Sequence, residues 1–258
     1  DIAEVRRGIT TGANEFFYLD RETIEKWGIE EEFLRPVVKG PKDCATVLVK
    51  REDLSNWVLM CHEDRDALRE AAVLEYIERG ESRGFDRRPS CRGRARWYDL
   101  GQRGVPDLFV VKGTWPRHLL PLNAAQACCD QQLYEVYLSS GNATATGQLA
   151  NSSLSFLFLE LLGRCNFGEG ILWLAVYEAQ DLLVLSPELV NRAQVESAFT
   201  RLTQRTTATV FEEVSRADRR ALDDIVFDAL GLTRGERDAV YEAVVSLVEG
   251  RLKKARSV

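Results

Sequence analysis

This 258-residue sequence has few histidines and methionines, and it lacks the cysteine spacing of metal sites. It contains two histidines and one methionine, and its six cysteines form no Cys-x-x-Cys pair. Because structural zinc sites need closely spaced Cys and His ligands, we expect no metal in this chain. We expect the cysteines to be reduced and mostly buried thiols, as in cytoplasmic proteins.

Long apolar runs are also missing. No uninterrupted run of about 18 apolar residues occurs, so no membrane-spanning helix and no membrane partner are expected. The amino-terminal stretch has no apolar signal-peptide core. Because the single methionine, Met60, lies inside the chain, we expect the chain to be part of a longer cytoplasmic protein.

The motifs of common active sites are absent as well. The sequence has no Walker loop, no Gly-x-Ser-x-Gly, no His-Glu-x-x-His and no Gly-x-Gly-x-x-Gly after a predicted strand. Asp107 and Lys112 partly match a metal-nuclease signature, but Val110 takes the place of its second carboxylate. One carboxylate holds Mg²⁺ poorly. We interpret Asp223, Asp224 and Asp228 as a solvated helix face that pairs with nearby arginines such as Arg219 and Arg220.

The charge is unevenly distributed. The net charge of −6 alone argues weakly against a nucleic-acid partner. However, residues 79–118 contain ten Lys and Arg against four Asp and Glu, whereas residues 1–78 contain eleven against eighteen. A basic middle inside an acidic chain is more informative than the total.

Within this middle, five arginines fall within ten residues, interleaved with Gly93 and followed by Trp97 and Tyr98. These arginines are Arg87, Arg88, Arg92, Arg94 and Arg96. A guanidinium offers a planar fork that fits a phosphate or the edge of guanine. The stretch predicts either a nucleic-acid contact or a surface loop whose arginines pair with the acidic first part of the chain.

The periodicity of apolar residues predicts an α+β fold, with a mixed β-sheet followed by a helical tail. Strands are predicted at 14–19, 45–50, 56–62, 107–113, 117–123 and 132–138. Helices are predicted at 21–27, 65–81, 149–164, 187–202, 216–232 and 233–255, with Gly80 as the end of the second. We also predict a hairpin at 170–187 and a loop from 82 that ends in a strand near Trp97. This divides the chain into an α+β region, 1–186, and a helical segment, 187–258, packed on it.

Five motifs follow one another in a recognisable order. They are VRRGITTGANEFFYL, RWYDLGQRGVPDLFVVKG, RHLLPLN, NSSLSFLFLELLGRCNFGEGILWLAVYEAQDLLVLSP and RALDDIVFDALGLTRGERDAVYEAVVSLVEGRLKKA. Through these motifs the chain resembles the C-terminal target-recognition region of the TaqI/Eco57I-like adenine-specific DNA methyltransferases of type II and type IIG restriction-modification systems.

The resemblance implies a two-part enzyme. Its N-terminal domain binds S-adenosylmethionine and holds a flipped adenine through an Asn-Pro-Pro-Tyr or Asn-Pro-Pro-Phe motif, while its C-terminal part recognises the DNA sequence. This chain has no Asn-Pro-Pro. We therefore expect no cofactor and no methylation by the chain alone, with double-stranded DNA and its own N-terminal methyltransferase domain as partners. The alternative is a protein-interaction domain of a restriction-modification assembly, in which the helical tail docks a partner.

The resemblance and the basic stretch together give a set of candidate DNA-binding residues. They are Thr11, Gly12, Asn14, Arg88, Arg92, Arg94, Arg96, Lys112, Arg117, Asn123, Asn151 and Ser152. Two questions stay open. Asn123 could bond adenine or cap the next helix, and Asn151 could seat a phosphate at a helix start or serve as an ordinary N-cap.

The turn at residues 10–14 gives a geometric test of this set. We predict that Thr11, Gly12 and Asn14 are exposed on the same side as Arg92 to Arg96. The aromatic residues Trp97 and Tyr98 match the end of the family's variable loop, where they belong either to the core or to the contact surface.

Overall fold

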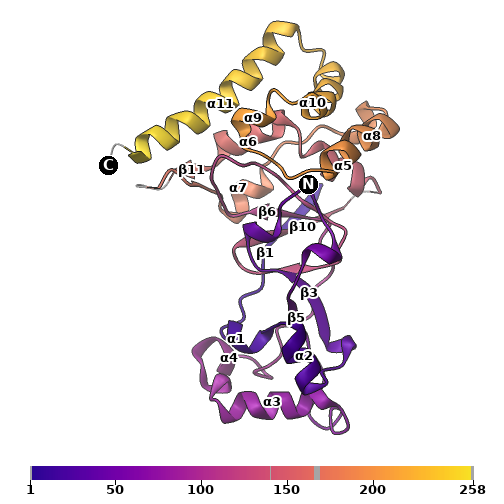
Figure 1. The fold of residues 1–258 in the computed structure, drawn as a ribbon, viewed down its shortest axis with the longest axis vertical. Helices are drawn as coiled ribbons and strands as arrows, with labels where there is room; N and C mark the ends of the chain where they lie inside the picture. Colours follow the sequence, from indigo (N-terminus) through magenta and orange to yellow (C-terminus); the bar gives the residue numbers. More distant parts are fainter. Residues whose placement is uncertain (1, 140, 166–168, 257–258) are drawn as a thin grey trace.

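The computed structural model describes residues 2–139, 141–165 and 169–256. The fold is α+β, as predicted, and the molecule is elongated (Figure 1). A first lobe contains α1–α4 with β2, β3 and β5, and a helical lobe contains α5–α11. The five-stranded sheet lies between the two lobes and is called the waist below. No helix in the described ranges is long and apolar enough to cross a membrane.

The waist sheet has the strand order β1-β10-β6-β8-β4. Its strands are β1 (Ala3–Arg7), β4 (Leu48–Val49), β6 (Leu108–Val111), β8 (Leu122–Asn123) and β10 (Leu133–Leu138). β10 is antiparallel to both β1 and β6, with Val136 opposite Val5 and Leu108. The antiparallel pair of Leu108 and Leu122 joins the two stretches predicted as strands at 107–113 and 117–123. Buried apolar side chains of these strands explain why they form a central layer.

The helical lobe packs on this sheet. Its helices are α5 (Ala143–Leu149), α6 (Ser153–Leu162), α7 (Val176–Gln180), α8 (Arg192–Thr203), α9 (Val210–Glu213), α10 (Ala217–Ala229) and α11 (Arg234–Arg256). Phe156 of α6 and Val244 of α11 join Val110 and Val136 of the sheet in one buried cluster. The predicted C-terminal helices are confirmed, whereas the domain boundary between residues 186 and 187 stays a prediction.

The start of α11 follows its sequence signature. The Glu236 carboxylate accepts the Thr233 backbone N–H at 2.7 Å, and the Thr233 hydroxyl accepts the Glu236 N–H at 3.4 Å. This reciprocal pair satisfies backbone donors that the first helical turn leaves free. Short-range chemistry alone was sufficient to place this helix start.

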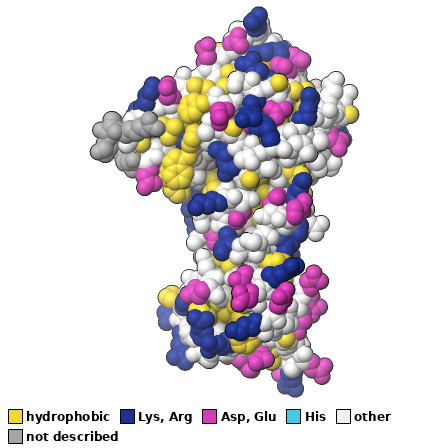
Figure 2. All heavy atoms as spheres, in the orientation of Figure 1, with side chains coloured by type: hydrophobic (Ala, Val, Ile, Leu, Met, Phe, Trp, Pro, Cys, Tyr) yellow, Lys and Arg dark blue, Asp and Glu magenta, His cyan; other side chains and the backbone are white. Residues whose placement is uncertain are grey.

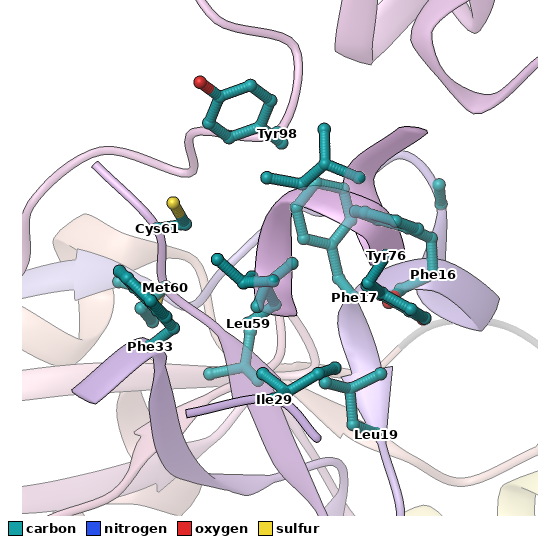
Figure 3. Close-up of a cluster of buried hydrophobic side chains, with 14 of the residues drawn as sticks. Phe16, Phe17, Leu19, Ile29, Phe33, Leu59, Met60, Cys61, Tyr76 and Tyr98 are labelled. Carbon is teal, nitrogen blue, oxygen red and sulfur yellow. The ribbon is translucent and has the colours of Figure 1, made fainter. Parts of the chain in front are cut away.

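The first lobe has a four-stranded sheet, order β2-β5-β3-β9, and an aromatic core. Its strands are β2 (Tyr18–Leu19), β3 (Leu34–Val38), β5 (Trp57–Leu59) and β9 (Cys128–Cys129). Its helices are α1 (Asn14–Phe17), α2 (Arg21–Trp27), α3 (Ala72–Ser82) and α4 (Pro89–Arg92). Figure 3 shows Phe16, Phe17 and Tyr76 grouped in this core, where the rings of Phe16 and Tyr76 stack at 4.8 Å between centroids.

Short elements complete the chain. The 3₁₀ turns are η1 (Glu31–Phe33), η2 (Pro41–Asp43), η3 (Arg51–Asp53), η4 (Phe85–Arg87) and η5 (Pro187–Leu189). A small antiparallel sheet has the order β11-β12-β7, formed by β11 (Arg164–Cys165), β12 (Leu172–Trp173) and β7 (Gly113–Thr114).

Three local predictions were wrong. The stretch 14–19 is α1 followed by β2, because the Ala13 carbonyl accepts the N–H groups of both Phe16 and Phe17 and so starts a helical turn. In the predicted hairpin at 170–187, α7 takes the place of the turn, where the Glu178 carboxylate accepts the Ala175 N–H at 2.6 Å, and residues 182–186 form no strand. Near Trp97 the structure has no strand. In each case, a local hydrogen bond or long-range packing outweighed the apolar pattern.

The prediction that Gly80 ends the helix at 65–81 was also wrong. The helix begins at Ala72 and continues to Ser82. A Cβ atom on Gly80 would lie 2.6 Å from Phe16 and 2.7 Å from Trp97. Glycine is needed here because two aromatic rings pack directly against the helix backbone.

Candidate nucleic-acid interface

The turn at residues 10–14 lies against α4, as the geometric prediction required. Gly12 has φ +76°, and a Cβ on it would lie 2.6 Å from the Ser90 Cβ. Gly12 and Asn14 are exposed. Thr11, however, is only 1% exposed, because its hydroxyl bonds the Asn14 side chain and the Ala13 N–H. The prediction that Thr11 is exposed was therefore wrong.

Arg94 ties this turn to the basic stretch. Its guanidinium donates to the carbonyls of Thr10 and Thr11, at 3.0 and 2.7 Å, and to the Trp97 carbonyl at 3.0 Å. The partners are neutral carbonyls, so the positive charge is not cancelled by an acid. Arg94 acts as a cationic brace of the turn.

The other three candidate arginines of the basic stretch divide into two groups. Arg88 pairs with Glu15 at 2.5 Å, and Arg96 pairs with Asp64 and Asp99 at 2.7 and 2.8 Å. The hydrogen bond from Arg88 lowers the pKa of Glu15. Pairing with the acidic first part of the chain, the alternative left open by the sequence, thus holds for these two residues.

Arg92 is the exception in this group. It lies at the end of α4 and is exposed. Within the described ranges its side chain makes no hydrogen bond or ion pair, so its cation is available to a ligand. Figure 2 shows Lys and Arg side chains gathered on the first lobe, with acidic side chains among them.

Trp97 and Tyr98 belong to the core. The Trp97 ring lies 4.6 Å from that of Phe16, and Tyr98, labelled in Figure 3, is 2% exposed. The Tyr98 hydroxyl donates to the Glu63 carbonyl at 2.9 Å. Of the two roles that the sequence left open, packing is the one observed.

Asn123 holds a loop of its own chain. Its amide donates to the carbonyls of Pro106 and Ala127, and its oxygen accepts the Ala127 N–H, each at 2.9 Å. These bonds occupy the groups that would have been needed to bond adenine. The residue is not a helix cap either, because the next helix, α5, begins at Ala143.

Asn151 and Ser152 are enclosed and were wrongly placed at the interface. Asn151 is fully buried and clamps Leu120, accepting its N–H at 3.0 Å and donating to its carbonyl at 2.8 Å. Ser152 is the N-cap of α6 and accepts the Ser155 N–H at 3.3 Å. A carboxylate from α10, that of Asp223, accepts the Ser153 N–H at 2.7 Å and so fills the place proposed for a phosphate.

Lys112 and Arg117 line a groove of about 940 Å³ at the waist. Its other lining residues include Lys39, Lys42, Trp115, Gln131, Gln132 and Trp173. Arg117 donates to the carbonyls of Pro41 and Cys44, at 3.0 and 2.9 Å, and so holds the η2 turn in place. Most of these residues were not predicted as site residues from the sequence, because they come from chain segments that are distant in sequence and carry no shared motif.

No cluster of His, Cys, Asp and Glu that could hold a metal ion occurs in the part of the chain that the structure describes. Five cysteines are buried and Cys165 is exposed. The paired acids of α10 are dispersed: Asp223 is buried, whereas Asp224 and Asp228 contact Arg237 of α11 at 3.5 and 2.5 Å. The predicted helix-face role holds for the exposed two, but with a different arginine.

A comparison with known families decides the assignment. Residues 1–222 match the family described as the C-terminal domain of the Type II methyltransferase M.Eco57I. The chain belongs to this family. This is the family that the order of the five motifs predicted.

Individual relatives agree with this assignment. The chain is 28% identical over 116 residues to the Type II methyltransferase M.AccI of Acinetobacter calcoaceticus, a match that covers 42% of this chain and 21% of that protein. The fold is similar to that of the type IIG restriction endonuclease BpuSI, with a TM-score of 0.68, 12% identity, and coverage of 99% of this chain and 31% of the other.

A second solved structure shares the fold. It is the type IIL restriction-modification enzyme MmeI in complex with DNA, with a TM-score of 0.62 and 15% identity. The match covers 100% of this chain and 36% of MmeI. The matches cover between 21% and 36% of the length of each of these relatives.

Proposed function

We propose that this chain is the sequence-specific DNA-recognition region of an adenine-specific DNA methyltransferase in a restriction-modification system. The observation that carries the proposal is the family match over residues 1–222. Arg92, Gly12 and Asn14 support it, because they form an exposed surface beside a turn braced by Arg94. A cation without an acidic partner is suited to a DNA phosphate.

The proposal includes the rest of the enzyme. The chain spans 21% of M.AccI, and it contains no Asn-Pro-Pro motif. We therefore assign S-adenosylmethionine and methyl transfer to an N-terminal methyltransferase domain, with this chain supplying target recognition. A cytoplasmic location follows from the same role, since the DNA substrate lies there.

The alternative, a protein-interaction domain, predicts a contiguous apolar patch on the last two helices. Along the described residues of α10 and α11, the large apolar side chains are mainly buried: Val226, Phe227, Tyr241 and Val244 all lie in core clusters. Leu247 is an exposed exception, at 37%. This burial favours a role for α10 and α11 in packing within the chain over a role in docking a partner protein.

Binding to duplex DNA tests the proposed function. We expect the full-length protein to bind a duplex that contains its target, and the affinity to fall steeply as salt rises. Arg92→Ala should weaken binding, whereas Lys26→Gln, a change at an exposed lysine of α2, should leave it unchanged. Absence of salt-sensitive binding by the wild-type protein, together with no methylation of adenine in any duplex, would contradict the proposal.

A further inference from the structure

We propose that the waist groove and the turn at residues 10–14 form one continuous track for a DNA duplex, with Trp115 as its aromatic contact. The groove is defined by Lys39, Lys42, Lys112, Trp115, Gln131 and Trp173. This inference rests on the proposed function and adds the surface that performs it. Charge, an aromatic wall, continuity with the turn and the chemistry of the ligand each support it.

The groove carries cations that the protein leaves available. Lys42 is exposed, and neither Lys42 nor Lys112 has an ion pair within the described ranges. Lys39 is exposed, and its ammonium contacts the neutral amide of Asn56, at 3.4 Å, and the Tyr18 ring. Three lysines without ion pairs on one concave surface produce a local positive potential, despite the net negative charge of the chain.

Asp43, the one acid among the described residues that line the groove, forms no ion pair with these lysines. The Asp43 carboxylate accepts the backbone N–H groups of Lys39 and Gly40, at 2.6 and 3.2 Å. It is thus used to close the η2 turn that carries Lys42. The same turn is fixed from the other side by Arg117, whose guanidinium donates to the Pro41 carbonyl. The groove is built on a braced turn.

Two tryptophans, Trp115 and Trp173, form an aromatic wall of the groove. Trp115 is 51% exposed, and its indole N–H donates to the Glu169 carbonyl at 3.3 Å. Trp173 of β12 packs so closely on Gly113 of β7 that a Cβ there would lie 3.2 Å from its ring. A large aromatic surface that is fixed and half open to solvent, next to lysines, suits contact with a nucleic-acid base or sugar.

Gln131 joins the groove to the turn. It lines the groove, and its side chain accepts the Thr10 hydroxyl at 3.3 Å. The Thr10 carbonyl in turn accepts from Arg94 at 3.0 Å. The unpaired lysines, the exposed glutamine, the turn and the arginine stretch are therefore consecutive neighbours on the surface, and one elongated polyanion could contact all of them.

Duplex DNA is the ligand that this chemistry fits best. Lysines bind phosphates without regard to sequence, and a half-exposed indole can pack against the sugars and base edges beside them. Gln131 and Gln132 are both exposed beside the groove. A duplex presents phosphates and sugars along its whole length, and it can therefore contact the lysines and the tryptophans together. The side chains of Gln131 and Gln132 already bond the Thr10 hydroxyl and the Lys39 carbonyl. We therefore assign phosphate contact to the lysines and base or sugar contact to Trp115.

The lysine test uses the full-length protein and the salt dependence of its binding to a target duplex. The double variant Lys42→Gln, Lys112→Gln should reduce the slope of log affinity against log salt by about 0.9 for each phosphate that a lysine no longer neutralises. Lys26→Gln is the matched control, because this lysine is exposed on α2 and lies outside the groove. A slope equal to that of the control would overturn the role of the lysines.

The aromatic test compares three variants in the same assay. Trp115→Ala should weaken binding about fivefold, which corresponds to the loss of about 1 kcal/mol of aromatic contact. Trp115→Phe should retain most of the affinity, and Tyr177→Ala, at an exposed aromatic of α7, should have no effect. Equal affinities for Trp115→Ala and the wild type would remove Trp115 from the interface. Thermal unfolding of each variant verifies that it is folded.

The combined outcomes separate this inference from the proposed function. If the wild-type protein does not bind DNA, the proposed function is wrong. If it binds, and Arg92→Ala weakens binding while every groove variant behaves as wild type, the function stands and the groove inference is wrong. If a base-free polyanion such as dextran sulfate binds equally well to the wild type and to Trp115→Ala, while DNA discriminates between them, base contact by Trp115 is supported.

Discussion

At the scale of single residues, arginines of one sequence cluster have different roles. Arg94 braces the turn through neutral carbonyls, Arg88 and Arg96 are paired with acids, and Arg92 is exposed without a partner among the described residues. The sequence alone does not distinguish the four, because each is an arginine in the same basic, glycine-containing stretch. Their roles differ because a guanidinium binds whichever carbonyl or carboxylate the fold places within reach.

The brace and the exposed arginine can be separated by mutation. Arg94→Ala should lower the free energy of unfolding by about 1–3 kcal/mol, because the Thr11 and Trp97 carbonyls are deprived of a charged donor. Arg92→Ala should change it by less than about 0.5 kcal/mol, since Arg92 holds nothing in place. Urea denaturation of both variants measures these values. Equal destabilisation by the two substitutions would contradict the division of roles.

At the scale of elements, the helical lobe is fixed by charged clamps between helices. Arg205, which follows α8, contacts Asp218 of α10 at 2.5 Å and Glu213 of α9 at 2.5 Å. Arg219 of α10 is fully buried and also contacts Glu213, at 3.1 Å. Such clamps define how short helices are positioned, because each charge that is partly buried needs its partner.

The clamp predicts an acid-sensitive contribution to stability. The hydrogen bond from Arg205 lowers the pKa of Asp218 below its ordinary 3.8. A carboxyl group whose pKa is lowered in the folded state stabilises the fold at pH values above its ordinary pKa. This contribution disappears as the pH falls through the pKa of the folded state. Asp218→Asn should lower the unfolding free energy at pH 7 by about 1–3 kcal/mol and flatten the decline in stability below about pH 4.

The matched control for this prediction is Asp238→Asn, at an exposed carboxylate of α11. Its unfolding free energy and its acid dependence should match those of the wild type. Denaturant unfolding at a series of pH values measures both. An Asp218→Asn protein with unchanged acid dependence would show that the clamp contributes nothing.

The start of α6 gives a second prediction at this scale. Ser152→Ala should cost about 0.5–2 kcal/mol, the usual effect of removing an N-cap. Asn151→Ala should cost more, because it leaves the buried N–H and carbonyl of Leu120 without partners, each worth about 1–3 kcal/mol. Thermal or urea unfolding ranks the two variants. The reverse order would contradict the assignment of Ser152 as the cap and Asn151 as the strand clamp.

At the scale of the whole molecule, the waist connects the two lobes (Figure 1). Glu135 of β10 is fully buried, and its carboxylate accepts from Arg103 at 2.8 Å and from the Tyr137 hydroxyl at 3.0 Å. Arg103 also donates to the Arg7 carbonyl of β1, and its own carbonyl accepts from Arg35 of β3. Arg103 therefore bonds both sheets: its side chain pairs with Glu135 and bonds β1, and its backbone carbonyl bonds β3.

Removal of this pair tests how the lobes are coupled. Arg103→Ala should lower the unfolding free energy by about 3–5 kcal/mol, because it leaves the Glu135 carboxylate buried and unpaired. Arg7→Ala is the control, since the Arg7 side chain is exposed and only its carbonyl accepts from Arg103. Urea unfolding gives both values. A small effect of Arg103→Ala would show that the waist does not depend on this pair.

Local patterns in the sequence were sufficient for the fold class, the C-terminal helices, the central strands and the family. These features depend on apolar periodicity, helix caps and the order of motifs, which are all properties of short segments. Local patterns were less reliable at 14–19, where the structure has a helical turn in place of the predicted strand. They also failed at Gly80, where glycine is needed because Phe16 and Trp97 pack against the helix backbone.

Only the tertiary structure decided which polar residues are accessible. Asn151 and Ser152 carry the right chemistry for DNA but lie beneath α10, whereas Lys42 and Trp115 share no motif yet line one groove. The physical reason is that accessibility and partnership depend on contacts between distant segments. The type of a residue determines which groups its side chain can bond. The fold determines whether those bonds are already made within the protein or are available to a ligand.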